Sequence, residues 1–182
     1  VWIDIETSGL NARTDKILEV AIVVTDNELF EMARKQMVIK HPNTLLSKMG
    51  PWSVETHTKN GLLKEMANAK YPTNIADAFM AEWLIETLGS VSKPYMCGTT
   101  VHFDREFLKR HMPRLESVFH YRNYDIATLR EFFEANAPEG FTFKGKGSTH
   151  RALDDIDYCI NALRHYRRAL ATACVCAGIV AR

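Results

Sequence analysis

The sequence predicts a mixed α/β fold in which helices pack on a five-stranded sheet. Segments with strand-like apolar patterns come first along the chain, and helical apolar periodicity follows them. Two further short strand-like segments interrupt the helices, which gives the order βββαβαβα and favours one mixed sheet. No repeat, low-complexity tract or Pro/Gly-rich linker divides the chain, so residues 1–182 are expected to form a single domain.

Three strands are expected at the start of the chain. Apolar residues alternate with Asp4 and Glu6, which predicts a strand at Val1–Glu6. A nearly continuous β-branched run predicts a buried strand at Lys16–Thr25. After a turn signal, a third strand is expected at Phe30–Lys40, so the three strands form an antiparallel meander.

The rest of the chain is expected to be mainly helical. One or two short helices are predicted within Ser53–Met66, and a clearer helix at Ile75–Leu88 has Asn74 as its cap. The apolar stripe of that clearer helix is expected to be Ile75, Phe79, Trp83 and Leu88. The remaining predicted elements are a strand at Tyr95–Thr100, a helix at Asp104–His111 ended by Pro113, a strand at Arg122–Asp125, a helix at Ile126–Asn136, and a long helix from about His150 with an apolar face of Leu153, Ile156, Ile160, Leu163 and Leu170.

Composition limits the possible partners. Lys and Arg number 23 and Asp and Glu 22, a formal net charge of +1, which is not the strongly basic balance of a protein that coats long nucleic acid. The four cysteines follow no disulfide framework and predict a reduced, intracellular protein of the cytoplasm or a mitochondrion. No apolar run reaches the ~18 residues needed to span a bilayer, so no membrane association is expected. No signal peptide is visible, and the sequence leaves open whether a targeting segment precedes the first strand.

The first strand carries a pair of acids. Asp4 and Glu6 are two residues apart, so their carboxylates share one face of the strand. Two such groups resist joint ionisation unless a cation lies between them. The alternative is an ordinary exposed strand face. Gly9, which follows, allows the backbone to turn tightly and to approach a ligand.

Two further segments carry candidate site residues. Asp104 lies near the start of a predicted helix, where an acid is also an ordinary partner of the helix dipole. Five helical residues separate His150 and Asp155 by ~140° around the axis, so the two converge only if His150 lies on the entry to the helix. Ser148 is a cap candidate that permits this geometry, and spacing favours Asp155 over Asp154. The alternative is a capped, solvated helix start.

The conjunction of these motifs resembles a known enzyme family. D-x-E on the first strand, an Asp at a mid-chain helix start and H-x(4)-D near the end resemble the DEDDh branch of the DEDD 3′→5′ exonuclease superfamily, which has a ribonuclease H-like fold. Within that branch the chain is similar to the oligoribonucleases in VWIDIETSGL, KILEVAIVVTD, HTKNGLL, DREFLKRHMP, FHYRNYDIATLREF and THRALDDI. It departs from them at Thr7, Thr99 and Thr100, where Met, Asn and Ser are usual, and the acids are intact.

The resemblance implies a chemistry for these residues. Two divalent ions, Mg²⁺ or Mn²⁺, are expected, one held by Asp4, Glu6 and Asp155 and the other by Asp4 with Asp104. His150 is the implied general base toward the attacking water. The implied reaction removes nucleoside 5′-monophosphates from the 3′ end of very short RNA oligonucleotides.

Substrate-binding residues also follow from the resemblance. Leu10 is expected to wedge against a terminal base and Trp52 to stack on one, although Trp52 is as readily explained by plain packing. His57 and Thr100 match positions that contact phosphate and the 3′ end. Tyr121 and Arg122 match a pair that caps the 5′ phosphate, with Tyr121 reaching over from the second subunit of a homodimer.

Two other functions stay open at this point. One is a DEDDh exonuclease that trims longer single-stranded RNA or DNA. The other is a catalytically inactive nucleic-acid-binding module on the same fold, which the presence of competent residues at all the implied active-site positions disfavours.

Overall fold

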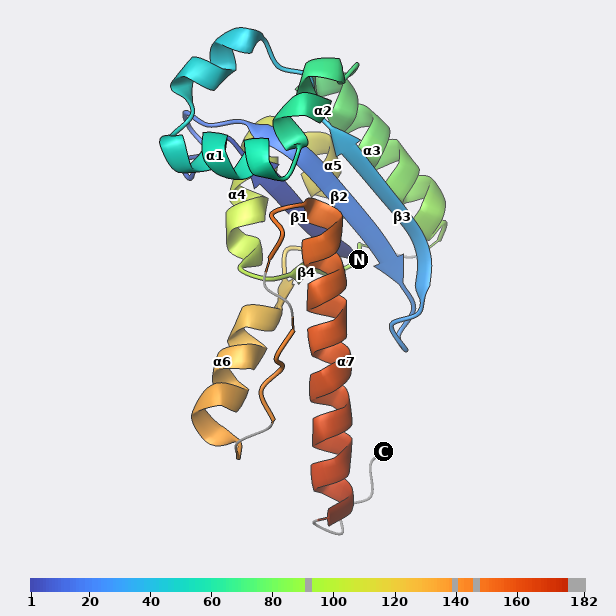
Figure 1. The fold of residues 1–182 in the computed structure, drawn as a ribbon. Coiled ribbons are helices and arrows are strands. Elements are labelled where there is room, and N and C mark those ends of the chain that lie inside the picture. Colours follow the sequence, from blue (N-terminus) through green and yellow to red (C-terminus); the bar gives the residue numbers. More distant parts are fainter. Residues whose placement is uncertain (91–92, 139–140, 146–147, 177–182) are drawn as a thin grey trace.

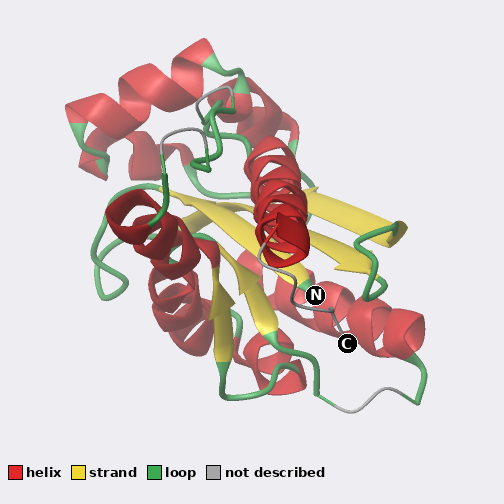
Figure 2. Ribbon diagram, turned by 90° about the horizontal axis from the view of Figure 1, so that it is seen from below, coloured by secondary structure: helices red, strands yellow, loops and turns green. Residues whose placement is uncertain are grey.

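The computed structural model describes residues 1–90, 93–138, 141–145 and 148–176. Its centre is one five-stranded sheet in the order β3-β2-β1-β4-β5, with helices on both faces (Figures 1 and 2). The strands are β1 (Trp2–Thr7), β2 (Ile17–Thr25), β3 (Glu31–Val38), β4 (Met96–Gly98) and β5 (Asn123–Asp125). β1, β2 and β3 pair antiparallel, whereas β4 pairs parallel with both β1 and β5. The predicted mixed five-stranded sheet and its meander are confirmed.

The helices complete the layers on the sheet. They are the 3₁₀ helix η1 (Asn43–Lys48), α1 (Pro51–Lys59), α2 (Leu62–Asn68), α3 (Thr73–Leu88), α4 (Val101–His111), α5 (Pro113–Val118), α6 (Ile126–Asn136) and α7 (Ala152–Cys176). α7 crosses one face of the sheet and extends beyond it, with α6 beside its projecting part (Figure 1). None of the helices in the described ranges is both long enough and apolar enough to cross a bilayer.

Each face of the sheet has its own core, because alternate strand residues point to opposite sides. Ile3 and Ile5 of β1 enter the core beneath α3, α4 and α5. Trp2, from the same strand, enters the core beneath α6 and α7. The alternation therefore places Asp4 and Glu6 on the side of β1 that faces α7.

The predicted apolar face of α3 is wrong at Ile75 and Phe79, whereas Trp83 and Leu88 pack against the core as expected. The helix begins at Thr73 after Pro72, so Asn74 lies inside the helix and does not cap it. Ile75 and Phe79 are exposed, and the buried residues of the helix are Ala76, Asp77, Met80, Ala81 and Leu84. The cause is a tertiary contact, since the Asp77 carboxylate accepts the backbone N–H groups of Arg114 and Leu115 at the start of α5 and turns this face inward.

Other boundaries also differ from the prediction. α4 begins at Val101, three residues before Asp104, and the pre-helical strand ends at Gly98. Pro113 ends α4 as expected but also opens the unpredicted helix α5, in the first-turn position that suits proline. The apolar face of α7 is buried as far as Tyr166, whereas Leu170 is exposed because the helix has passed the edge of the sheet.

Candidate functional site

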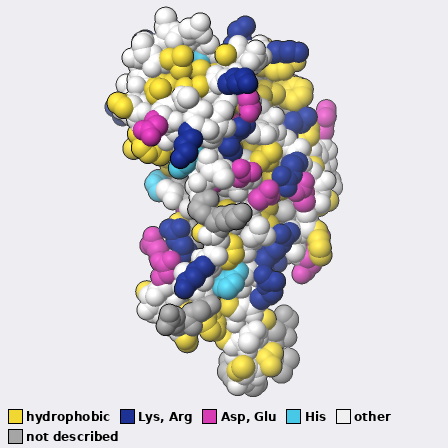
Figure 3. Space-filling model, viewed as in Figure 1, with side chains coloured by type: hydrophobic (Ala, Val, Ile, Leu, Met, Phe, Trp, Pro, Cys, Tyr) yellow, Lys and Arg dark blue, Asp and Glu magenta, His cyan; other side chains and the backbone are white. Residues whose placement is uncertain are grey.

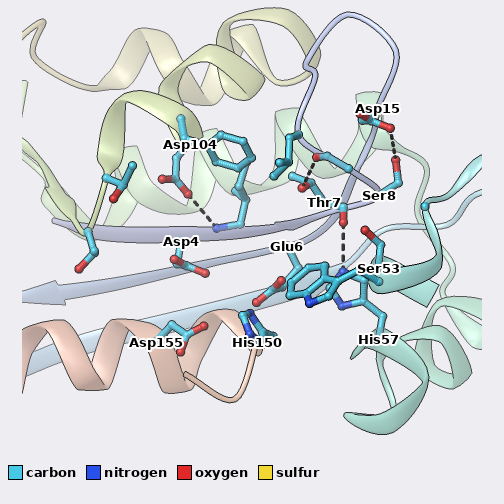
Figure 4. Close-up of a pocket in the computed structure, with 18 residues that line it drawn as sticks. Asp4, Glu6, Thr7, Ser8, Asp15, Ser53, His57, Asp104, His150 and Asp155 are labelled. Carbon is cyan, nitrogen blue, oxygen red and sulfur yellow. Dashed lines mark hydrogen bonds between the residues drawn. The ribbon is translucent and has the colours of Figure 1, made fainter. Parts of the chain in front are cut away.

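A pocket of about 690 Å³ opens where β1, α1, the start of α4 and the start of α7 meet (Figure 4). Most of the residues singled out in the sequence line it: Asp4, Glu6, Leu10, Trp52, His57, Thr100, Asp104, His150 and Asp155. Tyr121 and Arg122 do not line it. Four of the predicted acids and two histidines, His57 and His150, thus come from distant segments to share one cavity.

Asp104 reaches this pocket because β4 is short. β1 and β4 pair only at Trp2 and Cys97, so the next part of the β1 edge has no strand partner there. The backbone N–H of Ile5 donates instead to Asp104 Oδ1, at 3.1 Å. Thr100, with φ of 58°, turns the chain from β4 into α4 and so brings the first turn of that helix against β1.

Asp125 fixes the start of α4. Its carboxylate accepts the N–H groups of Thr100 at 3.0 Å and Val101 at 3.1 Å, and also that of Ala127 at the start of α6. The partly buried carboxylate of Asp125, on the edge strand β5, therefore caps two helices at once and holds the turn that carries Asp104. The sequence analysis missed this role, although Asp125 stands directly before a helix, where a capping acid is expected.

His150 and Asp155 approach from the opposite side of β1 (Figure 4). His150 lies two residues before α7 with φ of 54°, so it is on the entry to the helix, as convergence with Asp155 demands. Ligand atoms of Glu6, His150 and Asp155 all lie within 4.8 Å of one another. Ser148 Oγ donates to Asp155 Oδ2 at 2.8 Å, whereas Asp154 is exposed and accepts from Thr149 Oγ1 at 2.7 Å.

The acids of the pocket are difficult to ionise together. Burial raises the pKa of Asp4 well above its usual range, and the charges of Asp104 and Glu6 raise it further. Burial and the charge of Asp155 raise the pKa of Glu6 to about 8. Burial also raises the pKa of Asp104 to about 8, and it raises the pKa of Asp155.

This donor set fits a divalent cation. Carboxylate oxygens are the hard ligands that Mg²⁺ and Mn²⁺ prefer. A cation among them would offset both the mutual repulsion and the cost of burial that raise these pKa values. The described residues therefore contain an acidic group capable of holding metal, centred on Glu6, His150 and Asp155.

The remaining pocket residues form its walls. Leu10 is 83% exposed at the rim, and Trp52 on α1 is 61% exposed. The Trp52 ring meets the His150 ring edge-on, with centroids 5.2 Å apart. His57 is buried, with Nε2 at 3.1 Å from the carbonyl oxygen of Thr7, and burial lowers its pKa.

Tyr121 and Arg122 lie outside the pocket, between α5 and β5. Tyr121 is 73% exposed, its ring centroid is 4.3 Å from that of His120, and the Arg122 guanidinium lies 5.5 Å from the same ring. Neither residue is among those that line the pocket of its own chain.

Two further acids shape the site and were not singled out in the sequence. Asp15 accepts the backbone N–H of Asn11 at 2.9 Å and the Ser8 hydroxyl at 3.3 Å, which closes the loop that carries Leu10. Glu19 is fully buried on β2, directly across from Glu6. A lone acid inside an apolar strand was the available signal for Glu19, because such a group requires partners.

The sequence is similar to known exonucleases over most of its length. The profile of an exonuclease family, RNase T, matches residues 1–163. The chain is 41% identical to the oligoribonuclease of Nitrosomonas eutropha over 174 residues, which cover 93% of this chain and 94% of that protein. It is 39% identical to the oligoribonuclease of Chromobacterium violaceum over 171 residues, which cover 92% of each.

Solved structures share the fold. Exonuclease I of E. coli, in a zinc-bound complex with single-stranded DNA, superposes with a TM-score of 0.71 at 21% identity over 92% of this chain. Exonuclease I from Methylocaldum szegediense gives a TM-score of 0.66 at 21% identity, again over 92% of this chain. The chain spans about 40% of the length of these two proteins. The shared architecture is the ribonuclease H-like exonuclease fold.

Proposed function

Because this chain belongs to the oligoribonuclease family, and is therefore a 3′→5′ exoribonuclease of the DEDD superfamily, we propose that it degrades very short RNA oligonucleotides to nucleoside 5′-monophosphates with two divalent ions. The observation that carries the proposal is the convergence of four acids and His150 in one pocket. We further propose that residues 1–182 act as a single exonuclease domain, which the match over residues 1–163 supports.

The acids of the pocket divide into two overlapping ligand sets. Asp4, Glu6 and Asp155 would hold one Mg²⁺ or Mn²⁺ ion, and Asp4 with Asp104 would hold the other. A pair of such ions supplies a nucleophile at neutral pH and stabilises the attacking and leaving oxygens of an in-line displacement. The buried position of Asp104, fixed by the Ile5 N–H group, keeps its other oxygen available to the pocket.

His150 is assigned as the general base. It lies at the mouth of the acid cluster, beside Glu6 and Asp155, where its imidazole can take a proton from the attacking water. Attack on the last phosphodiester then breaks the bond to the 3′ oxygen of the preceding nucleotide, and the phosphate leaves on the released nucleoside. This scheme needs no covalent intermediate with the protein, so no Ser or Cys residue has a catalytic role in it.

The pocket walls suit a terminal nucleotide. Trp52 offers an exposed aromatic face and Leu10 an exposed apolar edge, so a base between them would be stacked and wedged. His57 and Thr100 line the same cavity as the acids and are assigned to the phosphate and the 3′ end. On the face shown in Figure 3, basic and acidic side chains are interspersed, which suits a short substrate better than a long polyanion.

Length selection is assigned to a homodimer. Tyr121 and Arg122 are exposed and lie outside the pocket of their own chain. In a dimer, Tyr121 would reach the partner's pocket and, with Arg122, close on the 5′ phosphate of the RNA. Only a very short oligonucleotide ends at that position, so the cap would measure length.

Digestion of a 5′-labelled RNA series tests the proposal. We expect release of 5′-mononucleotides with Mn²⁺ and none with EDTA, with the highest kcat/KM on the shortest members of a series that extends from dinucleotides to about 20 nucleotides. Tyr121→Ala should reduce cleavage of dinucleotides far more than cleavage of the longest members. Tyr71→Ala is the matched control, because Tyr71 is also an exposed tyrosine outside the pocket but has no part in the proposed cap.

Equal rates on all lengths, with Tyr121→Ala lowering them equally, would instead support an exonuclease that trims longer single strands. Failure of the unmodified protein to release mononucleotides from any RNA or DNA substrate would support an inactive binding module.

A further inference from the structure

His150 has a left-handed backbone conformation, which is uncommon for residues other than glycine. Its φ of 54° lies in the left-handed region, where a side chain with a Cβ is strained. Such strain persists only where the surrounding structure determines the conformation. The neighbours of His150 therefore decide where its imidazole lies relative to Glu6 and Asp155.

Both backbone polar groups of His150 are held by side chains. The N–H of His150 donates to Ser148 Oγ at 3.0 Å, and the carbonyl oxygen accepts from the side-chain amide of Asn60. Asn60 is itself fixed, since its Oδ1 accepts the backbone N–H of Leu62 at 3.1 Å. The carbonyl oxygen of Asn60 lies 3.5 Å from Arg151 Nη1, which connects this contact to the next residue of the chain.

Arg151 ties the same turn to two other elements. Its Nη2 lies 2.8 Å from Glu19 Oε1 and its Nε 3.3 Å from Glu19 Oε2, a two-point contact with β2. Its Nη1 and Nη2 each lie 2.9 Å from an oxygen of Glu65 on α2. The planar guanidinium is suited to such paired contacts, which fix direction as well as distance.

Glu19 could be mistaken for a fifth metal ligand, because it lies directly across from Glu6 on β2. Its oxygens are already occupied. Besides Arg151, they accept the side-chain amide of Gln36 and the backbone N–H of Ala152, the latter at 3.0 Å. Its side chain is fully buried, so no free face is left toward the pocket. Glu19 therefore anchors the start of α7 rather than a cation.

From this geometry we infer that Arg151, held by Glu19 and Glu65, is a positioning residue that keeps His150 at the reacting centre. The inference rests on the proposed function, in which His150 is the general base. Arg151 and Glu19 do not line the pocket, and the turn that carries His150 is their structural link to the reacting centre.

A double-mutant cycle between Arg151 and His150 tests the inference on a 5′-labelled short RNA with Mn²⁺. Loss of a general base costs about 10²- to 10⁴-fold in rate, which sets the size of the His150→Ala effect. Misplacement of the base by about 1 Å costs up to about 100-fold, so Arg151→Gln should lower kcat by about 10- to 100-fold with little change in KM. Arg151→Lys keeps the charge but lacks the planar fork, and should also be impaired.

The cycle separates positioning from a general structural role. If Arg151 acts through His150, adding Arg151→Gln to His150→Ala should lower the rate no further. A further fall by the factor seen in the single variant would overturn the inference, as would full activity of Arg151→Gln. The matched control is Arg34→Gln, since Arg34 also ties the sheet to α7, through Asp157, but lies far from the pocket. It should keep wild-type activity.

Removal of Arg151 alone leaves Glu19 buried without its charge partner, and this can prevent folding. The paired variant E19Q/R151Q removes both charges and should fold, with the same loss of kcat and the same epistasis toward His150→Ala. Absence of a cooperative thermal transition in the paired variant too would assign the cluster to folding and overturn the inference. An unmodified protein that releases no mononucleotides would overturn both proposals, whereas an active protein with an additive cycle would overturn only this one.

Discussion

Replacement of Asp104 by Asn should abolish exonuclease activity and yet stabilise the metal-free protein. In the unfolded chain Asp104 ionises near its ordinary pKa of 3.8, whereas burial raises the pKa in the folded protein to about 8. A carboxyl with a raised folded-state pKa contributes stability that is fully present below pH 3.8 and is lost as the pH rises toward 8. Asn does not titrate, so the variant escapes this loss. Its Oδ1 can still accept the Ile5 N–H group.

The size of the gain follows from the same pKa values. Between 3.8 and pH 7 there are about three pH units, and each corresponds to about 1.4 kcal/mol, so the limit is roughly 4 kcal/mol. Water entry and side-chain movement reduce such penalties, and we expect a gain of about 2 kcal/mol. For a chain of this size that corresponds to a rise in Tm of about 4–8 °C.

Thermal unfolding in EDTA, followed by calorimetry, measures this gain. The rise in Tm should be largest at pH 7 and about a third as large at pH 5, because only about one unit separates pH 5 from 3.8. Asp154→Asn is the control, since Asp154 is exposed, and should shift Tm by less than about 2 °C. An unchanged or lower Tm for Asp104→Asn at pH 7 would refute the reasoning that the acids repel and are desolvated.

Three more predictions concern the site and its support. The affinity for Mn²⁺ should rise from pH 6 to pH 8, because the ion must displace protons from the pocket acids, among them Glu6, whose pKa is raised to about 8. Calorimetry in buffers of different ionisation enthalpy would detect the released protons. An affinity that does not change with pH would contradict this prediction. Trp52→Ala should raise KM for a short RNA by roughly 5- to 150-fold, the equivalent of ~1–3 kcal/mol of base stacking, and an unchanged KM would exclude stacking. Gly98→Ala should destabilise the fold by about 1–3 kcal/mol in a thermal melt, since its Cβ would lie 2.9 Å from the carbonyl oxygen of Ile3 and force β1 and β4 apart. Gly50→Ala, with nothing within 4 Å of the new Cβ, should not.

The strands and their succession along the chain were predictable because the sequence patterns that indicate them are local. The alternation around Asp4 and Glu6 and the apolar run of β2 are set by which face of a strand is buried. The buried face of α3 was not fully predictable. Asp77 turns inward because its carboxylate accepts N–H groups at the start of α5, which lie 37 and 38 residues further along the chain. The periodicity of α3 alone favoured Phe79, which is exposed.

The candidate site was likewise predictable where local spacing determines it and not where distant contacts do. The spacing of His150 and Asp155 predicts that His150 precedes the helix, and the structure places it there with a left-handed backbone. The network that holds this backbone could not be predicted, because Asn60 at the end of α1 meets His150, and Glu19 on β2 meets Arg151, only in the folded chain. The proposed cap by Tyr121 and Arg122 is not tested by a single chain, since neither residue lines the pocket of its own chain.

We propose that four acids drawn from β1, α4 and α7 hold a pair of cations beside His150. Titration calorimetry with Mn²⁺ at pH 8 counts the bound ions. We expect two ions bound per chain, and loss of at least one of them when Asp4, the ligand shared by both sets, is replaced by Asn. Saturable binding of no ion, or two ions bound equally well by the Asp4→Asn variant, would contradict it.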